Sequence, residues 1–486
     1  MTTDHHRLLP PIPYATLADY LADNGGVALL EARSVEPDVL IDVVEGSGLR
    51  GRGGAGFPTG LKWRTVAKFE SDLLAANVVV NAAEGEPGTV KDRTLLQLNP
   101  YAVLEGALIA ARAVRANDIT IATKASFTDT VRRLHSAIDE IRAAGWLDDP
   151  DGTVSIAVVE GPDRYLFGEE TAMLEVLDGR QPMPRVAPPY RHGSVEVVTD
   201  QVAPASGHDS FEGAADVVMA GTGAGHEAPP TLANNVETLA NVPGIIALGP
   251  QWFRQIGTAD SPGTVLATVT GDVHHPGVCE IPLGLPLEEL VALAGGPVRG
   301  TRLVGVLGGV SNTFLTDLST PISYEAMRDA GSGLGSVSFR FVSEEMDPLA
   351  LAAGVSRFLA VESCGQCTPC KLDGLEIAHA LDRLCRNRGT ATDVTTVSVR
   401  LGTVAEGARC GLGRQHETVV GSILDAFPEA MDQHLRHERA ATEPTVIAAT
   451  AYIDDEGERV DQSIVTAEPA WSGLQTGPAN PPAATA

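Results

Sequence analysis

The stretch Cys364-Gly-Gln-Cys367-Thr-Pro-Cys370 places three thiols within seven residues, and a fourth thiol, Cys410, follows downstream. Two residues between successive cysteines let one loop present three sulfurs to one face of a cuboidal cluster, and a distant cysteine can close the cage. This spacing is typical of [4Fe–4S] ligation. We therefore predict a protein that carries single electrons, with Cys364, Cys367, Cys370 and Cys410 as the cluster ligands.

Other interpretations of these cysteines stay open from the sequence alone. Zinc prefers ligands delivered as two separated Cys/His pairs, and no histidine pair is spaced to complete such a site. Unligated structural thiols are a further alternative. Cys385, inside an amphipathic helical pattern, is the alternative fourth ligand, but glycines beside Cys410 let the backbone approach a cofactor more closely. Cys279 stands alone in a β-rich stretch and is expected in a core.

Composition excludes several classes of function. The 486 residues include 35 Lys and Arg against 63 Asp and Glu, a net charge of −28, which argues against a nucleic-acid partner because phosphate contacts need basic patches. The start lacks the basic and apolar regions of a secretory signal, and no apolar run is long enough to span a bilayer. We expect a cytoplasmic protein without direct membrane insertion, whose six cysteines suit a reducing compartment.

Hydrophobic periodicity divides the chain into segments of different character. Short β-branched runs at 77–81, 118–122 and 154–158 are typical of buried strands, and helical patterns cover 102–114 and 128–144. This alternation predicts an α/β layered domain. Farther along, strands with one helix indicate a small second domain, and a helical pattern then surrounds the cysteine loop.

Glycine makes up seven of the fifteen residues from 46 to 60. Glycine allows positive φ and leaves backbone N–H groups bare, which suits an anion or a flat ring. Gly51, Gly53 and Gly56 match G-x-G-x-x-G, but that fingerprint should follow a strand, and the residues before the loop could equally be helical. An ordinary flexible loop is the alternative, although the loop runs into side chains that a linker does not need, Phe57, Lys62 and Trp63.

Together, the loop and the cysteines resemble the flavin-bearing, NADH-oxidising subunit of respiratory complex I, a family shared with the diaphorase subunits of NAD-linked hydrogenases and formate dehydrogenases. The resemblance covers roughly residues 40–430 in the family's order. The matching segments are Gly51–Trp63, Asn81–Arg93, Phe167–Ala172, Asn234–Leu239, Gly271–Pro282 and Glu362–Lys371.

The resemblance implies a fold of the α/β class with further domains. A Rossmann-like domain that binds FMN and NADH is expected over residues 1–245, and a ubiquitin-like β-grasp domain of the SLBB type over 246–342. A helical bundle that holds the [4Fe–4S] cluster is expected over 343–440. The remainder, 441–486, is expected to be an extended tail with a disordered end.

Cofactor contacts are implied at positions that match the family's motifs. NADH is expected to lie along the glycine loop and to stack over FMN, and the loop residues concerned are Gly51, Arg52, Gly53, Gly54, Gly56 and Phe57. The flavin-contacting positions are Asn81, Glu84, Gly168, Glu169, Asn234 and Asn235. Glu86 matches the nicotinamide side, Tyr190 joins Phe57 around adenine, and Lys62 is expected to meet phosphate or a flavin oxygen. Glu170 matches an acid near the adenosine ribose; because a carboxylate repels a 2′-phosphate, we predict NADH over NADPH.

Several of these positions have structural alternatives. Glu169 and Glu170 could complement the dipole of a helix. Asn234 and Asn235 could cap a helix. The neighbouring charges of the second segment, Lys91 and Asp92, could be solvated at the surface.

The chain also departs from the family's usual pattern. Ala83 stands where an aspartate is usual, and Thr65 stands where an aromatic residue is usual, so contacts to flavin and adenine are expected to be altered. The connection over residues 190–233 and the tail beyond His437 are both longer than usual.

The resemblance implies a route for electrons from NADH through FMN to the cluster, with no side-chain nucleophile or general base. One cluster motif makes the chain an entry module, so further redox subunits are implied, among them a thioredoxin-like [2Fe–2S] partner. We therefore expect an NADH dehydrogenase subunit of a respiratory complex I-like assembly, held at the inner face of the cell membrane through its partners. The alternatives are the diaphorase subunit of an NAD-dependent formate dehydrogenase or NiFe hydrogenase, and a degenerate scaffold without catalysis.

Overall fold

The computed structural model describes residues 6–69, 75–185, 230–454, 457–461 and 465. Four runs of small and β-branched residues form a parallel sheet in the order β5-β2-β1-β6. Its strands are β1 Ala76–Ala82, β2 Ala116–Lys124, β5 Ser155–Gly161 and β6 Thr231–Asn235. α6 Pro100–Ala113, buried at every position except Arg112, lies between β1 and β2, and α7 Thr128–Ala143 connects β2 to β5. The predicted α/β domain is thus confirmed, and its predicted strands and helices lie within a few residues of the observed ones.

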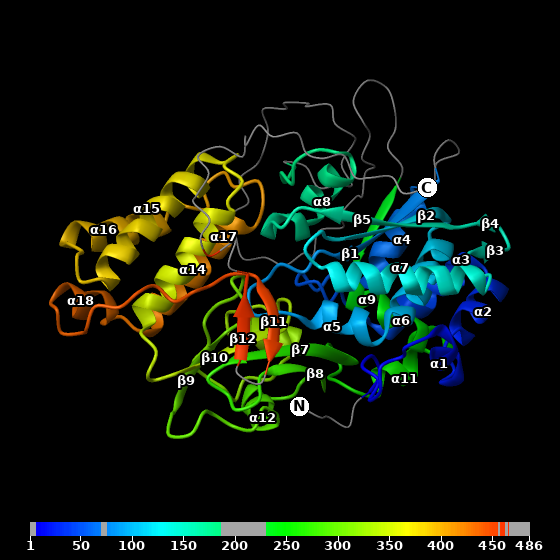
Figure 1. Ribbon diagram of the computed structural model, residues 1–486, viewed down its shortest axis with the longest axis horizontal. Coiled ribbons are helices and arrows are strands. Elements are labelled where there is room, and N and C mark those ends of the chain that lie inside the picture. The colour runs from blue at the N-terminus through cyan, green and yellow to red at the C-terminus, as the bar shows by residue number, and fades with distance from the viewer. Residues whose placement is uncertain (1–5, 70–74, 186–229, 455–456, 462–464, 466–486) are drawn as a thin grey trace.

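Further helices complete this first unit (Figure 1). The glycine loop lies between α3 Pro37–Ser47 and α4 Thr59–Lys68. Because a helix precedes the loop, the G-x-G-x-x-G match is not the dinucleotide fingerprint that follows a strand. The buried Phe253 on α11 packs into the same core, so this unit extends past residue 245. The remaining elements are α1 Leu17–Ala22, α2 Val27–Ser34, α5 Lys91–Leu98, β3 Asp148–Asp149, β4 Gly152–Thr153, the 3-10 helix η1 Tyr165–Gly168, α8 Glu170–Leu177, α9 Val236–Ala240, α10 Val242–Leu248 and α11 Pro250–Arg254.

A second sheet of four strands has the order β8-β7-β10-β9. Its central pair, β7 and β10, is parallel, and the outer pairs are antiparallel. One face packs on its own hydrophobic core. The elements are β7 Thr264–Gly271, β8 Gly277–Pro282, α12 Leu287–Leu293, β9 Leu303–Leu307, α13 Tyr324–Asp329 and β10 Ser338–Ser343.

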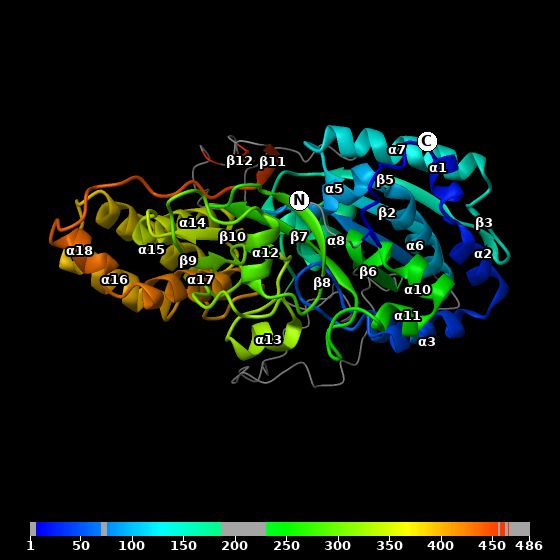
Figure 2. The same ribbon diagram turned by 90° about the horizontal axis from the view of Figure 1, so that it is seen from below.

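Five helices form the third unit, which lies on the opposite side of the molecule from the parallel sheet (Figures 1 and 2). They are α14 Pro348–Glu362, α15 Thr368–Cys385, α16 Ala391–Leu401, α17 Leu412–Ala426 and α18 Ala430–Leu435. The cysteine loop joins α14 to α15, and Cys410 lies just before α17. In the part of the chain that the structure describes, every helix is too short or too polar to cross a bilayer.

The segment predicted as an extended tail contains an antiparallel hairpin instead. β11 Thr450–Asp454 pairs with β12 Gly457–Val460. The chain before it is anchored by the buried Ile447 and Ala448, and Figure 1 shows the hairpin at the centre of the molecule, among the three units.

Candidate functional site

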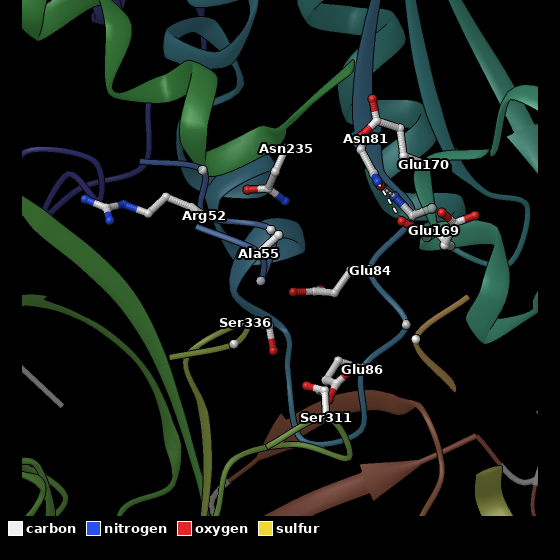
Figure 3. Close-up of a pocket in the computed structure, with 18 of the residues that line it drawn as sticks. Arg52, Ala55, Asn81, Glu84, Glu86, Glu169, Glu170, Asn235, Ser311 and Ser336 are labelled. Atoms are coloured by element: carbon white, nitrogen blue, oxygen red, sulfur yellow. Dashed lines mark hydrogen bonds between the residues drawn. The ribbon is translucent and has the colours of Figure 1, made fainter. Parts of the chain in front are cut away.

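A cavity of about 580 Å³ lies where the three units meet (Figure 3). It opens at the carboxyl ends of β1 and β6, the edge at which parallel α/β sheets bind ligands. The connections between β9 and β10 in the second unit contribute Ser311 and Gly335, and the helical unit contributes Gln415. Most of its walls come from 51–57, 81–92, 165–170, 233–238 and 410–412.

The glycine loop bends closely against two neighbours. Gly56 has φ +64°, and a Cβ there would lie 2.4 Å from the ring of Tyr324. A Cβ on Gly53 would lie 3.1 Å from the Cβ of Asn235. The loop is closed by a hydrogen bond from the Gly51 N–H to the Phe57 carbonyl oxygen, at 2.8 Å. Glycine is therefore needed at position 56 for backbone conformation and space together.

Arg52 behaves differently from the rest of the loop. Its side chain is 1% exposed and points away from the cavity (Figure 3). The guanidinium donates to the carbonyl oxygens of Pro262 and Thr264, at 3.3 and 3.1 Å, and to the Tyr324 hydroxyl at 3.1 Å. The structure thus places the Arg52 side chain against the second unit, and a cofactor contact through it has no support in this geometry.

Lys62 and Glu170 form an ion pair at the cavity wall. The ammonium nitrogen lies 3.0 and 3.1 Å from the two carboxylate oxygens, and both side chains are partly exposed. Lys62 comes from α4 and Glu170 from the first turn of α8, so the pair joins two elements 108 positions apart. The predicted phosphate-binding lysine is therefore already neutralised by the predicted ribose-binding acid.

Asn81, Gly168 and Glu169 lie together beside this pair. The Asn81 amide donates to the Gly168 carbonyl oxygen at 2.9 Å, and its own oxygen accepts the Ala83 N–H at 3.2 Å. Glu169 accepts the Ala172 N–H at 2.8 Å and so caps α8. The helix-terminus alternative for Glu169 is thus confirmed, while its side chain still borders the cavity.

The two asparagines after β6 have separate partners. The Asn234 oxygen accepts the indole N–H of the buried Trp63 at 2.9 Å. Asn235 caps α9 by accepting the Glu237 N–H at 3.0 Å, and its amide donates to Asp92 at 2.7 Å. The capping alternative therefore holds for Asn235 and not for Asn234.

Lys91 and Asp92 are buried, so the alternative that they are solvated surface charges is wrong. The Lys91 ammonium lies 2.8 Å from Asp92 and 2.7 Å from Glu237. Burial alone would lower the pKa of Lys91, but the two carboxylates raise it above its ordinary value. Burial raises the pKa of Asp92 to about 6, with the Glu84 carboxylate acting in the same direction against the opposing Lys91. Glu84 accepts the Asp92 N–H at 2.9 Å and pairs with Arg93 at 2.9 Å.

Glu86 lies on the far wall of the cavity. Its carboxylate accepts the Tyr165 hydroxyl at 2.7 Å, the Val310 N–H at 2.7 Å and the Ser311 hydroxyl at 3.0 Å. Burial raises the pKa of Glu86 in spite of these three donors. The Tyr165 hydroxyl also lies 3.3 Å from the Gln415 side-chain oxygen, which connects this wall to α17.

The four predicted ligand cysteines gather at one end of the helical unit, and Cys410 also lines the cavity. The Gln366 amide donates to the Cys364 sulfur at 3.4 Å, and the Arg409 N–H donates to the Cys367 sulfur at 3.3 Å. Burial raises the pKa of Cys370, and it raises the pKa of Cys410 to about 12. Such thiols become thiolates when a bound cation stabilises the anion.

This donor set fits an iron–sulfur cluster. In the described residues, no three His, Cys, Asp or Glu side chains converge closely enough for a single metal ion. A cuboidal cluster holds its thiolates farther apart than one ion does, so that observation is compatible with four thiols around a cluster-sized volume. Cys385 is fully buried in the helical core, and Cys279 is buried in the second sheet, as expected for structural thiols.

The bare backbone of the cavity fits a flat, phosphate-bearing cofactor. The glycine loop forms one wall with no side chain beyond Cβ between Gly53 and Gly56, and polar groups of β1, β6 and α8 face it. Ala83, where the family's carboxylate is missing, also lines the cavity. Thr65 does not: its hydroxyl donates to the Leu61 carbonyl oxygen at 2.7 Å.

One predicted residue cannot be placed, and several residues that line the cavity were not predicted from the sequence. Tyr190 lies outside the described residues, as does most of the 190–233 connection. Tyr165, Thr238, Ser311 and Gln415 line the cavity but were not predicted, because each stands outside the matched motifs or carries no local signal. The Tyr165-Leu-Phe-Gly168 turn, directly before a matched segment, is the signal that could have found the first of them.

A buried histidine in the helical unit gives a testable pH dependence. His416 Nε2 lies 2.8 Å from the Ser356 hydroxyl, and burial lowers the pKa of His416 to about 3. The unfolded chain therefore binds a proton that the folded chain excludes, so stability rises with pH between about 3 and 6.5.

The free energy of unfolding should therefore fall, through His416, by roughly 1.4 kcal/mol for each pH unit from pH 6 down to pH 4. His416→Asn keeps a hydrogen-bonding group and removes the titration, so its unfolding should depend less steeply on pH by that amount. Denaturant titrations at a series of pH values measure this, with the exposed His6→Asn as the matched control. Equal slopes for His416→Asn and the unaltered chain would refute the assignment.

Comparison with known proteins agrees with this geometry. The Nuo51 FMN-binding domain matches residues 44–244, the SLBB domain matches 266–313, and the NADH-ubiquinone oxidoreductase-F iron-sulfur binding region matches 350–434. The F subunit of NADH-quinone oxidoreductase from Streptomyces coelicolor is 35% identical over 446 residues, which span 90% of this chain and 92% of that protein. This chain belongs to the family of NADH-quinone oxidoreductase F subunits.

A further F subunit, a hydrogenase subunit and a solved hydrogenase structure are also similar to this chain. The corresponding F subunit of Mycobacterium tuberculosis is 36% identical over 87% of this chain and 90% of its own length. The NADP-reducing hydrogenase subunit HndC of Solidesulfovibrio fructosivorans is 31% identical over 90% of this chain and 84% of its own length. Among solved structures, an NAD+-reducing [NiFe]-hydrogenase in the H2-reduced state matches with a TM-score of 0.73 and 29% identity, over 90% of this chain and 68% of that one.

Proposed function

We propose that this protein is an NADH dehydrogenase subunit through which electrons enter a larger redox assembly. NADH and FMN would occupy the 580 Å³ cavity, and a [4Fe–4S] cluster would be held by Cys364, Cys367, Cys370 and Cys410. The observation that carries the proposal is that Cys410 lines the same cavity as the glycine loop. Under this proposal the flavin site and the cluster site would share a wall.

FMN, when bound, supplies the exchange between hydride transfer and single-electron transfer. The chain's own residues would hold and orient it. The glycine loop would let the cofactor approach the backbone, and the amide groups of Asn81, Asn234 and Asn235 are fixed by partners that prevent them from turning away. Glu86, held by three donors, would orient the nicotinamide side.

The test is one anaerobic preparation of the full chain. We expect flavin absorbance, about four iron atoms per chain, and ferricyanide reduction that depends on NADH. A colourless protein that contains neither group and does not oxidise NADH would instead support a degenerate scaffold.

A second candidate function is the NAD-facing subunit of a hydrogenase or formate dehydrogenase. It is favoured by the match to the NAD+-reducing hydrogenase structure, which covers 90% of this chain. The two functions differ in the partner and not in the cavity, so affinity purification from the native cell followed by identification of the bound subunits separates them. We further propose a thioredoxin-like [2Fe–2S] subunit among those partners, and a peripheral position at the inner face of the cell membrane that depends on them.

The preference for NADH should depend on Glu170. In Glu170→Gln the carboxylate that repels a 2′-phosphate is gone, while Lys62 keeps its charge. We expect the ratio of kcat/KM for NADH to that for NADPH to fall by about tenfold, which corresponds to about 1.4 kcal/mol. Glu175→Gln is the matched control, because Glu175 lies on the same helix but pairs with Arg180 and Arg185. A ratio that stays constant in Glu170→Gln would remove Glu170 from the dinucleotide site.

A further inference from the structure

The C-terminal hairpin lies beyond every region matched by a family model, since the last match ends at residue 434. It nevertheless contacts the wall of the cofactor cavity. The Thr450 hydroxyl accepts the Gly88 N–H at 2.8 Å, and the hydroxyl in turn donates to Glu458 at 2.5 Å. Glu458 also pairs with Arg340 on β10. The hairpin is therefore bonded both to the loop after β1 and to the second sheet.

Arg93 connects this hairpin to the cavity. Its Nη1 donates to the Ala451 carbonyl oxygen at 2.7 Å, and its Nη2 donates to the carbonyl oxygens of Thr450 and Thr89, at 2.6 and 3.2 Å. Its Nε donates to Glu84 at 2.9 Å. Three carbonyl oxygens thus fix the guanidinium plane, and the fixed plane directs its Nε–H at the Glu84 carboxylate.

Glu84 accepts the hydrogen bond from the Arg93 Nε, so the fixed guanidinium holds its carboxylate. It lines the cavity, and in Figure 3 its carboxylate projects toward the space between the glycine loop and Ser336. Its side chain is 3% exposed and that of Arg93 is 13% exposed, so the pair is shielded from water and its geometry is not averaged by solvent. The Arg93 guanidinium also stacks on the Phe127 ring at 4.4 Å, which limits its rotation further.

We propose that Arg93 and Thr450 are positioning residues for the cofactor site, through which the C-terminal hairpin holds the Glu84 carboxylate in place. The inference rests on the proposed function. The ligand affected is the flavin, because Glu84 stands at the end of β1 next to Asn81 and faces the glycine loop. Loss of the hairpin contacts would leave the charge of Glu84 and its hydrogen bonds from the Asp92 N–H and the Thr89 hydroxyl in place. It would free the Arg93 guanidinium that holds the other carboxylate oxygen.

The test measures FMN binding to flavin-depleted full-length protein by quenching of flavin fluorescence. Thr450→Val keeps the size of the side chain and removes the two hydrogen bonds of its hydroxyl, to Gly88 and Glu458. Arg93→Lys keeps the charge but cannot serve four acceptors. We expect the Kd for FMN to rise about tenfold in each. Tyr452→Ser, an exposed change on the same hairpin, should leave it unaltered. Melting temperatures identify any variant that fails to fold. If Arg93→Lys fails to fold, the test depends on Thr450→Val.

The outcomes separate the two proposals. If Glu84→Gln weakens FMN binding while Thr450→Val and Arg93→Lys bind FMN as tightly as the unaltered chain, the positioning role is overturned and the proposed function stands. If both positioning variants weaken FMN binding and retain kcat at saturating FMN, the role is supported over a general loss of structure. If the unaltered chain binds no FMN, the proposed function fails and this inference fails with it.

Discussion

Cys410→Ala is expected to lose the iron–sulfur cluster while keeping bound flavin. A [4Fe–4S] cluster needs four thiolates, and the remaining three come from one loop that the fourth ligand must close from the other side. Iron per chain should fall from about four to near zero after anaerobic purification, and the characteristic visible absorbance should disappear. NADH should still reduce the flavin, because the cavity residues on β1, β6 and α8 are untouched.

The matched control is Cys385→Ala. Cys385 is fully buried among apolar side chains of the helical unit, so its loss should cost stability and leave iron content unchanged. If iron were retained in Cys410→Ala and lost in Cys385→Ala, the assignment of the fourth ligand would be reversed. If iron were retained in both, a ligand other than cysteine would have to complete the site.

These two cysteines show what sequence can resolve about a site. Spacing alone identified the three-cysteine loop, because ligands close in sequence are close in space. The choice of a fourth ligand depended on which distant thiol the fold returns to the loop, and the argument from flanking glycines favoured Cys410. In the structure, Cys410 lies before α17 beside the cavity, whereas Cys385 lies in the core of the bundle. The choice of Cys410 as the fourth ligand stays a prediction, which the iron content of the two variants tests.

The parts of the site that sequence did not predict depend on long-range partners. Lys91 and Asp92 have the local pattern of solvated charges, and their burial follows from Glu237, which stands 146 positions after Lys91. Arg52 lies in a loop that otherwise faces the cavity, but carbonyl oxygens 210 and 212 positions away draw its side chain to the other side. No window of neighbouring residues contains that information.

The largest loss of stability is expected from Lys91→Met. Lys91 is 1% exposed and stands between the carboxylates of Asp92 and Glu237. Removing the ammonium leaves Asp92 without a cation and leaves Glu237 with only the Arg52 Nε, 4.0 Å from its other oxygen. Loss of one partner of a buried ion pair typically costs about 3–5 kcal/mol. Because Glu237 also accepts the Leu266 N–H at 2.9 Å, the damage should reach the contact between the α/β unit and the second sheet. Thermal unfolding of the full chain should show a melting temperature lower by roughly 10 °C.

A second substitution distinguishes charge from packing as the cause. In Lys91→Met with Glu237→Gln, one of the two carboxylates that faced the ammonium is neutral, and the glutamine can no longer repel Asp92. If uncompensated charge is the cause, the double variant should recover about half of the loss, so the two effects should be non-additive. Exposed Arg132→Met, which breaks only a solvated pair with Asp129, should change the melting temperature by little. A double variant less stable than Lys91→Met would mean that Lys91, Asp92 and Glu237 stabilise the fold through packing and hydrogen bonding. Uncompensated charge would then not be the cause of the loss.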